Sequence, residues 1–195
     1  LIDPEPGVLC THETLLLEQL ATLLETELTD DVGKITDALT GLMDRKGFER
    51  RAAQLLDICN GFRLSADLLF IDIDHFKKHN SLYGTEAGDL FLISFSRLLN
   101  DAFRDADLIC RFGSDEFVIL LVERSASEVN TMLQIMESRF QSSLAERRRE
   151  LGYSTGHAAL DHETHDDLQQ LLARADRDMY AARARATARG GIAGT

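Results

Sequence analysis

Two acidic residues follow an apolar run in the first half of the chain. Residues 66–72 are mostly apolar and end at Asp72, and Asp74 comes two residues later. Alternation along a strand sends Asp72 and Asp74 to the same side. An unpaired buried carboxylate is costly, whereas carboxylate oxygens are ligands that Mg²⁺ prefers. The spacing therefore indicates a metal site at the end of a core strand, with an acid that caps the next helix as the alternative.

A second acidic pair follows a short turn. Gly113 and Ser114 separate two apolar runs, and Asp115 and Glu116 come directly after them. Glycine followed by serine predicts a hairpin turn of type II′. Adjacent strand residues face opposite sides, so only one of these acids is expected to face the ligand of Asp72. A second carboxylate there would complete a site for the Mg²⁺ of a nucleoside triphosphate, the usual arrangement for phosphoryl transfer.

Charge and composition narrow the class of ligand. The chain has 33 Asp and Glu residues against 21 Lys and Arg, a formal net charge of −12, which argues against a nucleic-acid binder. Residues 174–189 carry five arginines, so a small phosphate-bearing ligand could be met at this basic end. The sequence contains no P-loop motif. A triphosphate would therefore be held by the metal, by backbone amides near Phe76 and by outlying cations.

The spacing of the cysteines and the length of the apolar runs bear on the cellular compartment. Cys10, Cys59 and Cys110 are far apart and form no CxxC pair, which suggests neither a disulfide framework nor a thiolate metal site. The longest apolar run is too short to cross a bilayer, and no charged-then-apolar leader opens the chain. We therefore expect a cytoplasmic chain with no membrane segment within it.

Periodicity predicts the elements that position these acids. Helical spacing is found over residues 11–28, 45–59, 89–103, 125–150 and 167–188, with Asn60-Gly61 expected to end the second of these helices and a serine cap expected at Ser125 or Ser127. Strands are predicted over residues 66–72, 108–112, 117–122 and 153–160. This order predicts an α/β (α+β) fold with a mostly antiparallel central sheet flanked by helices, of the ferredoxin-like or polymerase-palm type.

The first predicted helix, over residues 11–28, is amphipathic. Its leucines recur at three- and four-residue spacing along one stripe that is about two heptads long. Such a stripe either docks on the body of the same domain or forms a dimerising helix. Both interpretations stay open.

Four motifs in register carry a resemblance to the GGDEF family of diguanylate cyclases. They are DALTGLMDR at residues 37–45, IDIDHFKKHN at 71–80, GTEAGD at 84–89 and RFGSDEF at 111–117. The resemblance covers residues 37–189, nearly four-fifths of the chain. It implies a lead-in with an N-terminal helix over residues 1–35, a GGDEF domain over 36–190 and a flexible tail over 191–195.

The resemblance implies a half-site that binds one GTP and a divalent metal, Mg²⁺ or Mn²⁺. The metal ligands that it implies are Asp72, the carbonyl of Ile73 and Asp115, and the catalytic acids are Asp115 and Glu116. The GTP-binding residues that it implies are Asn80 and Asp89 for the guanine edge, with Phe76, Lys77 and Arg183 near the phosphates. In the family, two half-sites face each other as a homodimer and join two GTP molecules into cyclic di-GMP, releasing pyrophosphate.

Arg104 and Asp107 form an RxxD motif at the family spacing before the signature turn. The motif resembles the inhibitory site that binds cyclic di-GMP in this family. An arginine fork can pair with a guanine edge or a phosphate, while the aspartate accepts from guanine N–H groups. A surface ion pair is the alternative interpretation.

The chain departs from the family pattern at two functional places. Ser114 stands where the signature has glycine, so its side chain could crowd a nucleotide close to the backbone. The phosphate-binding Lys and Arg of the last helix correspond here to Arg183 and Thr187. Two functions therefore remain: a diguanylate cyclase with weak activity and product feedback, or an inactive GGDEF module that is a receptor for cyclic di-GMP or GTP.

Overall fold

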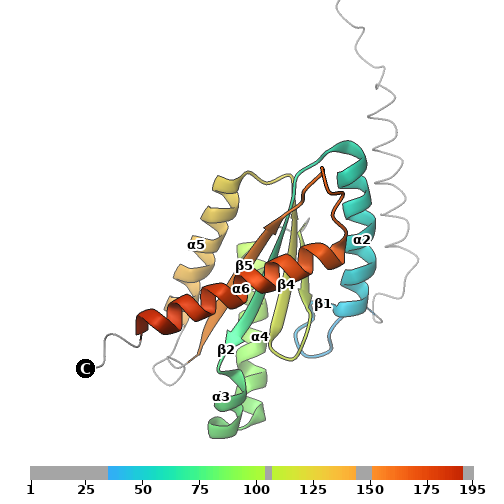
Figure 1. Cartoon of the computed structure of the whole chain (residues 1–195). Coiled ribbons are helices and arrows are strands. Elements are labelled where there is room, and N and C mark those ends of the chain that lie inside the picture. The colour runs from blue at the N-terminus through green and yellow to red at the C-terminus, as the bar shows by residue number, and fades with distance from the viewer. Residues whose placement is uncertain (1–34, 104–106, 144–150, 191–195) are drawn as a thin grey trace, which may run out of the picture. The chain divides into compact units, whose positions relative to one another are not determined.

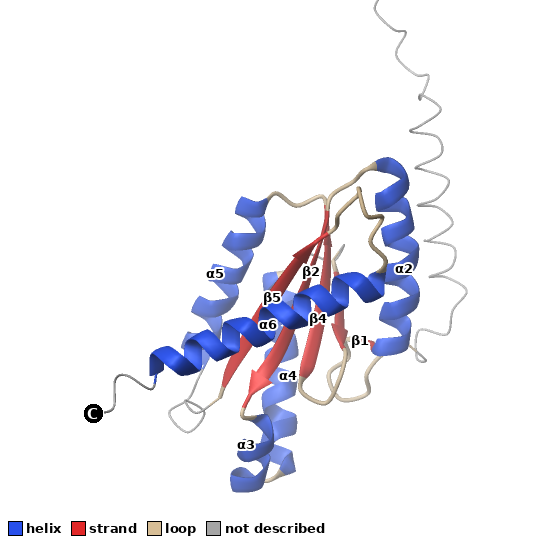
Figure 2. Cartoon of the chain, viewed as in Figure 1, coloured by secondary structure: helices blue, strands red, loops and turns tan. Residues whose placement is uncertain are grey.

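Five strands form one mixed sheet in the computed structural model, which describes residues 35–103, 107–143 and 151–190. The order across the sheet is β1-β3-β4-β2-β5, and every neighbouring pair is antiparallel except β1 and β3. The strands are β1 (Met43–Asp44), β2 (Ala66–Asp74), β3 (Leu108–Arg111), β4 (Glu116–Val122) and β5 (Gly152–Ala159). The predicted α/β fold with a mostly antiparallel sheet is confirmed, and Figure 2 shows the helices around it.

Helices cover both faces of this sheet. They are α2 (Arg45–Phe62), α3 (Phe76–Tyr83), α4 (Thr85–Ala102), α5 (Ala126–Ser143) and α6 (Leu168–Gly190). Helices α2 and α6 pack on one face, and α4 and α5 pack on the other, as Figure 1 shows. No helix in the described part of the chain is long and apolar enough to cross a membrane.

Strand β2 lies between β4 and β5. Its side chains point alternately to the two faces of the sheet, so it contributes to the hydrophobic core on each face. Leu69 and Ile71 belong to the core under α4 and α5, whereas Leu68 and Phe70 belong to the core under α2 and α6. The same alternation sends Asp72 to the face that α6 covers. Helix α6 therefore packs over the face of the sheet that carries the side chain of Asp72.

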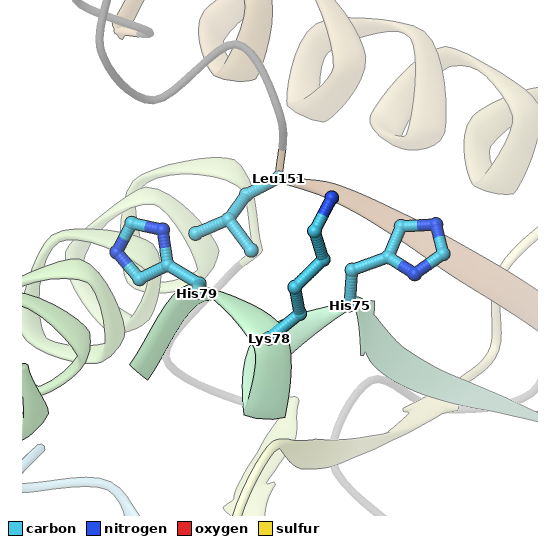
Figure 3. Close-up of a pocket in the computed structure, with 4 residues that line it drawn as sticks. All are labelled: His75, Lys78, His79 and Leu151. Carbon is cyan, nitrogen blue, oxygen red and sulfur yellow. The ribbon is translucent and has the colours of Figure 1, made fainter. Parts of the chain in front are cut away.

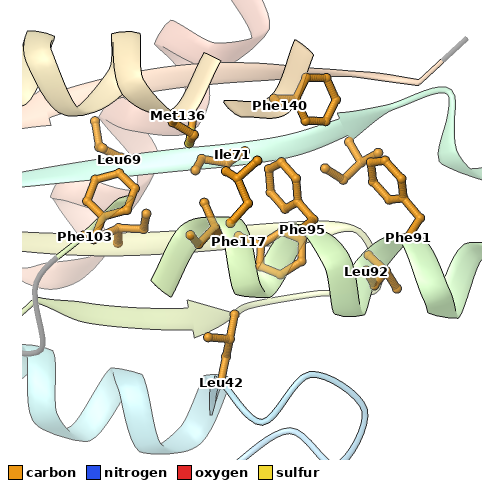
Figure 4. Packing of buried hydrophobic residues seen from close by; sticks show 14 of the residues in the cluster. Leu42, Leu69, Ile71, Phe91, Leu92, Phe95, Phe103, Phe117, Met136 and Phe140 are labelled. Atoms are coloured by element: carbon orange, nitrogen blue, oxygen red, sulfur yellow. The ribbon is translucent and has the colours of Figure 1, made fainter. Parts of the chain in front are cut away.

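Aromatic rings fill the core under α4 and α5 (Figure 4). The ring of Phe95 lies 5.1 Å from that of Phe117 and 5.9 Å from that of Phe140, measured between centroids. Phe117 is completely buried directly after the acidic pair. Because a buried aromatic side chain contributes about 1.5–3 kcal/mol by burial alone, this packing fixes the start of β4.

Helix α6 approaches the sheet closely at Gly156 of β5. A Cβ atom there would lie 2.0 Å from the carbonyl oxygen of Ala175 and 2.2 Å from the amide nitrogen of Met179. These are backbone atoms, so a side chain at this position would push the helix away. The absence of a side chain at Gly156 therefore sets how near the later residues of α6 come to β2.

Several predicted boundaries differ in the structure. Helix α2 does not end at Asn60-Gly61 but runs to Phe62, where Arg63 adopts a left-handed conformation and donates its N–H to the carbonyl of Cys59. Helix α3 was not predicted. The predicted serine cap is confirmed, because Ser125 and Glu128 bond reciprocally at the start of α5. The predicted helix over residues 11–28, residues 144–150 and the predicted tail lie outside the described residues.

Candidate functional site

Three polar side chains line up across the sheet at the end of β2. Asp72 is the register partner of Glu116 on β4 and of Ser154 on β5. Residues directly opposite each other on neighbouring strands face the same side, so all three point toward α6. Asp72, the predicted metal ligand, therefore lies between the carboxylate of Glu116 and the hydroxyl of Ser154.

Asp115 joins this row from the turn. Its carbonyl accepts a hydrogen bond from the N–H of Ile73 at 3.0 Å. Because Asp115 precedes β4 and is not part of it, strand alternation does not send it away from Asp72. The expectation that only one of Asp115 and Glu116 faces the ligand of Asp72 stays a prediction, although the charge of Asp115 acts on Asp72 and that of Asp72 acts on Glu116.

Burial, with a further contribution from neighbouring carboxylates, raises the pKa of Asp72 and of Glu116. Burial raises the pKa of Asp72, and the charges of Asp115 and Asp74 add to this effect, while Arg183 opposes it. Burial likewise raises the pKa of Glu116, with further contributions from Asp72 and Asp115. Such a cluster of partly buried acids favours the binding of a cation.

The signature turn differs from the predicted type II′ hairpin. Phe112 and Gly113 both donate their N–H groups to the carbonyl of Glu116, at 2.8 and 3.2 Å. Gly113 is not among the glycines with a positive φ, which a type II′ turn would require. The lack of a side chain at Gly113 instead leaves room for the carboxylate of Glu116, because a Cβ atom at Gly113 would lie 2.2 Å from Oε2 of Glu116.

Arg111 holds the signature turn from outside. Its Nη1 donates to both carboxylate oxygens of Asp37, at 3.1 and 3.2 Å, and its Nη2 donates to the carbonyl of Ser114 at 2.8 Å. Asp37 in turn accepts from the N–H and hydroxyl of Thr40. The first and last of the four motifs are therefore in direct contact.

Asn80 of α3, one of the two predicted guanine-reading residues, lies against Gly88 of α4. Oδ1 of Asn80 lies so close to Gly88 that a Cβ atom at Gly88 would be 2.0 Å from it. Asp89 is the next residue along α4. Oδ1 of Asn80 is buried and has no hydrogen-bond partner in the structure. A buried acceptor without a partner is costly, and a ligand N–H group would satisfy it.

The N-terminus of α3 begins at Phe76, directly after His75 in a left-handed conformation with φ 60°. No side chain caps this end of the helix, so its first amides can meet an anion such as phosphate. Phe76 itself is buried, whereas Lys77 is exposed. The backbone contact at Phe76 stays a prediction.

A pocket of about 250 Å³ lies beside α3 and is lined by His75, Lys78, His79 and Leu151. Figure 3 shows that the rings of His75 and His79 point away from each other. They do not converge on one point in the pocket.

Arg183 of α6 contacts the acids at the end of β2. Its Nη2 lies 2.5 Å from Oδ1 of Asp72, and its Nε lies 2.8 Å from Oδ1 of Asp74. The predicted phosphate ligand Arg183 thus pairs with the predicted metal ligand Asp72. The side chain of Thr187 is outside the described part of the chain.

Asp107 of the RxxD motif is buried against an arginine that sequence reasoning missed. Nη2 of Arg124 lies 2.7 and 2.8 Å from the two carboxylate oxygens of Asp107. Both side chains are only 2% exposed. Arg104 lies outside the described residues. No spacing in the sequence links Arg124 to Asp107, since the contact depends on the pairing of β3 with β4.

The donor set at the end of β2 is suited to a hard divalent cation. Two carboxylates, those of Asp72 and Asp115, and the carbonyl of Ile73 are oxygen ligands of the kind that Mg²⁺ and Mn²⁺ prefer. Within the described ranges, no group of three or more His, Cys, Asp or Glu side chains is arranged to hold a metal. The expected set uses a backbone oxygen as its third ligand and does not need such a group.

A family model described as "Diguanylate cyclase, GGDEF domain" matches residues 34–189. The chain belongs to the GGDEF domain family. Among curated proteins, it is 32% identical over 171 residues to the diguanylate cyclase DgcP of Pseudomonas aeruginosa, covering 86% of this chain and 25% of that protein. The chain spans well under half of the length of the curated relatives that it matches.

Solved GGDEF structures share this fold. The GGDEF domain of PA1120 (TpbB or YfiN) from Pseudomonas aeruginosa has a TM-score of 0.69 and 31% identity, covering 77% of this chain and 89% of that one. The GGDEF domain of DgcB from Caulobacter crescentus, in complex with c-di-GMP, has a TM-score of 0.70 and 25% identity, covering 76% and 90%. The resemblance expected from the four motifs is therefore confirmed.

Proposed function

We propose that this GGDEF domain is a diguanylate cyclase that joins two GTP molecules into cyclic di-GMP. The observation that carries the proposal is the convergence of Asp72, Asp115 and Glu116 at one end of β2. The curated relative DgcP of Pseudomonas aeruginosa is a diguanylate cyclase, which supports the same activity here. The reaction forms two bonds between a 3′-oxygen and an α-phosphorus and releases two pyrophosphates.

The metal in this proposal is Mg²⁺ or Mn²⁺, held by Asp72, Asp115 and the carbonyl of Ile73. When bound, it supplies positive charge to the phosphate oxygens of the reacting nucleotide. Glu116 faces the same side as Asp72 and can accept the proton that the attacking 3′-hydroxyl loses.

The nucleotide would lie between the acids and the helix pair α3 and α4. Asn80, with its unpartnered buried oxygen, and Asp89 would bind the N–H groups of the guanine edge. The first amides of α3 at Phe76, together with Lys77 and Arg183, would bind the phosphates. This arrangement holds one GTP and leaves the second reactant to another subunit.

A homodimer would then be required for turnover. Each half-site carries one set of acids and one guanine-reading pair, whereas the reaction consumes two GTP molecules. Holding the two reactants face to face on two subunits would replace a collision of free nucleotides by a reaction between bound ones. Activity should therefore depend on protein concentration or on forced dimerisation.

The direct test is to incubate the dimerised protein with GTP and Mg²⁺ or Mn²⁺ and to separate the products by chromatography. Cyclic di-GMP and pyrophosphate should appear, and Asp115→Ala should abolish both. Absence of product from a dimer that binds GTP would overturn the proposal.

A second function is favoured by one observation. The Ser114 hydroxyl donates a hydrogen bond to Oδ1 of Asp115, so one predicted metal ligand already has a partner. A domain weakened in this way would serve as a receptor for cyclic di-GMP or GTP. Arg104 is the proposed side-chain ligand of cyclic di-GMP, because the carboxylate of Asp107 is buried against Arg124. Calorimetry would then detect binding without turnover, and Arg104→Ala should abolish the binding of cyclic di-GMP.

In an active enzyme, the same Arg104 would carry product feedback. Added cyclic di-GMP should then slow pyrophosphate release by the wild-type protein but not by Arg104→Ala. Equal inhibition of both proteins would remove the RxxD motif from the proposal.

A further inference from the structure

The side chain of Arg183 on α6 contacts the carboxylates of Asp72 and Asp74 on β2. Its Nη2 donates to Oδ1 of Asp72 at 2.5 Å and to the carbonyl of Asp72 at 3.4 Å. Its Nε donates to Oδ1 of Asp74 at 2.8 Å. The guanidinium therefore has one end on a proposed metal ligand and another end on an acid to which no role has been assigned.

Ser154 completes the anchor for Nε. Its Oγ accepts from Nε of Arg183 at 3.2 Å and donates to Oδ1 of Asp74 at 2.8 Å. Ser154 is buried at 8% exposure, and Asp74 has a side-chain exposure of 24%. Asp74 of β2 and Ser154 of β5 thus hold the inner part of the guanidinium independently of Asp72.

The contact with Asp72 differs from this anchor because it uses an oxygen that a metal would need. A divalent cation and an arginine cannot both occupy Oδ1 of Asp72 at bonding distance without strong repulsion between their charges. The Arg183 side chain is 34% exposed, so its outer nitrogen can leave toward solvent while Nε stays on Asp74 and Ser154.

We propose that Arg183 is an exchangeable counter-ion of Asp72, positioned by Asp74 and Ser154, and that it releases Asp72 when a divalent metal binds. The inference rests on the metal role proposed for Asp72. The released Nη2 is then available to the nucleotide phosphates, and an arginine fork pairs well with phosphate. One residue thereby neutralises the acids before binding and the phosphates after binding.

The exchange predicts that Arg183 weakens metal binding in the absence of nucleotide. Mn²⁺ affinity is measured by electron paramagnetic resonance without GTP, on folded protein verified by its thermal melt. Arg183→Gln should bind Mn²⁺ about tenfold more tightly than the wild type, because a competing cation in direct contact is removed. The same variant should bind GTP more weakly in the presence of Mn²⁺, because the released guanidinium is missing.

Arg177→Ala is the matched control, since Arg177 lies on the same helix and its Nε donates only to the carbonyl of Ala173 one turn earlier among the contacts recorded for it. It should leave Mn²⁺ affinity unchanged. Ser154→Ala removes part of the anchor without touching a proposed metal ligand, and it should tighten Mn²⁺ binding by about two- to threefold. Arg183→Lys keeps the charge and should fall between the wild type and Arg183→Gln.

Unchanged or weaker Mn²⁺ binding by Arg183→Gln would overturn the exchange, as would a lack of Mn²⁺ binding by every protein tested. Neither measurement requires turnover. A domain that makes no cyclic di-GMP but shows the tighter Mn²⁺ binding would support the exchange while refuting the cyclase. The failures of the two proposals are thus distinguishable.

Discussion

Ser114 donates its hydroxyl hydrogen to Oδ1 of Asp115, the neighbouring carboxylate of the signature turn. The side chain of Ser114 is exposed and makes this contact at the place where the family has glycine. Sequence reasoning attributed to Ser114 a steric effect on the nucleotide. The structure adds a second effect, because a hydrogen bond to a carboxylate competes with a metal for the same oxygen.

Ser114→Gly should therefore raise cyclase activity by about two- to tenfold, since a hydrogen bond to a charged group is worth about 1.5–3 kcal/mol and only part of it opposes metal binding. The free energy of unfolding should change by less than about 1 kcal/mol. Pyrophosphate release measures the activity, and urea unfolding measures the stability. If turnover stays the same while Thr187→Arg raises it, the missing cation of α6 is limiting and the turn is not.

Gly88→Ala tests the guanine-binding role proposed for Asn80. A methyl group at Gly88 would collide with Oδ1 of Asn80, so we expect GTP affinity to fall by about tenfold or more, which is about 1.4 kcal/mol. Fluorescence titration with a labelled GTP analogue would measure it.

Gly61→Ala is the control for this substitution, because Gly61 also lies in a helix but has nothing within 4 Å of the added Cβ atom. It should stabilise the fold by about 0.5–1 kcal/mol and leave GTP affinity unchanged. If Gly88→Ala binds GTP as well as Gly61→Ala does, Asn80 is not positioned by Gly88 for guanine.

Arg124→Met should cost about 3–5 kcal/mol of stability, because it leaves the buried carboxylate of Asp107 without its cation. Urea unfolding measures the loss. Arg124→Met combined with Asp107→Leu should recover most of it, since an apolar pair can replace a buried ion pair.

The exposed pair of Arg63 and Glu163 gives a comparison, because its side chains are 69% and 84% exposed. Glu163→Gln should change stability by less than about 1 kcal/mol. A loss below about 1 kcal/mol for Arg124→Met as well would show that Asp107 keeps solvent or another partner when Arg124 is gone.

His157 gives the fold a pH dependence. Its hydrogen bond to Asp67, with Nε2 and Oδ1 2.6 Å apart, raises its pKa, and this effect outweighs burial, which lowers it. A raised pKa favours the folded state when His157 is protonated. The stabilisation is therefore complete below the ordinary pKa of about 6.5 and is lost as the pH rises through the raised value.

Urea unfolding at pH 6 and pH 9 should show that His157→Gln destabilises the protein at pH 6 but hardly at pH 9. The difference should be at most about 1 kcal/mol, because the His157 side chain is 44% exposed. In a protein that carries Asp67→Asn, the effect of His157→Gln on the free energy of unfolding should no longer depend on pH. An equal loss at both pH values would contradict the assignment.

The predicted strands and most of the predicted helices follow from local periodicity. Strand β2 was predicted from its apolar run, and α4 and α6 from their three- and four-residue spacing. Helix α3 was missed because its eight residues contain few apolar positions. The predicted break at Asn60-Gly61 was wrong because the helix continues to Phe62 and ends where Arg63 adopts a left-handed conformation.

The site was predictable where it lies in contiguous motifs. Asp72, Asp115 and Glu116 could be singled out because acids at the end of apolar runs are unusual packing choices. The contact of Arg183 with Asp74 and Ser154 could not, since it joins three elements that are far apart in sequence. Strand register brings Ser154 opposite Asp72, and no local pattern determines register between distant strands.

Arg111 connects the carboxylate of Asp37, near the first described residue, to the backbone carbonyl of Ser114 in the signature turn. The guanidinium of Arg111 therefore links Asp37 directly to the signature turn. A rotation or pull applied at Asp37 would be passed on to Ser114 without crossing the sheet. Loss of the Asp37 carboxylate would therefore leave the backbone of the signature turn with a less firmly held arginine.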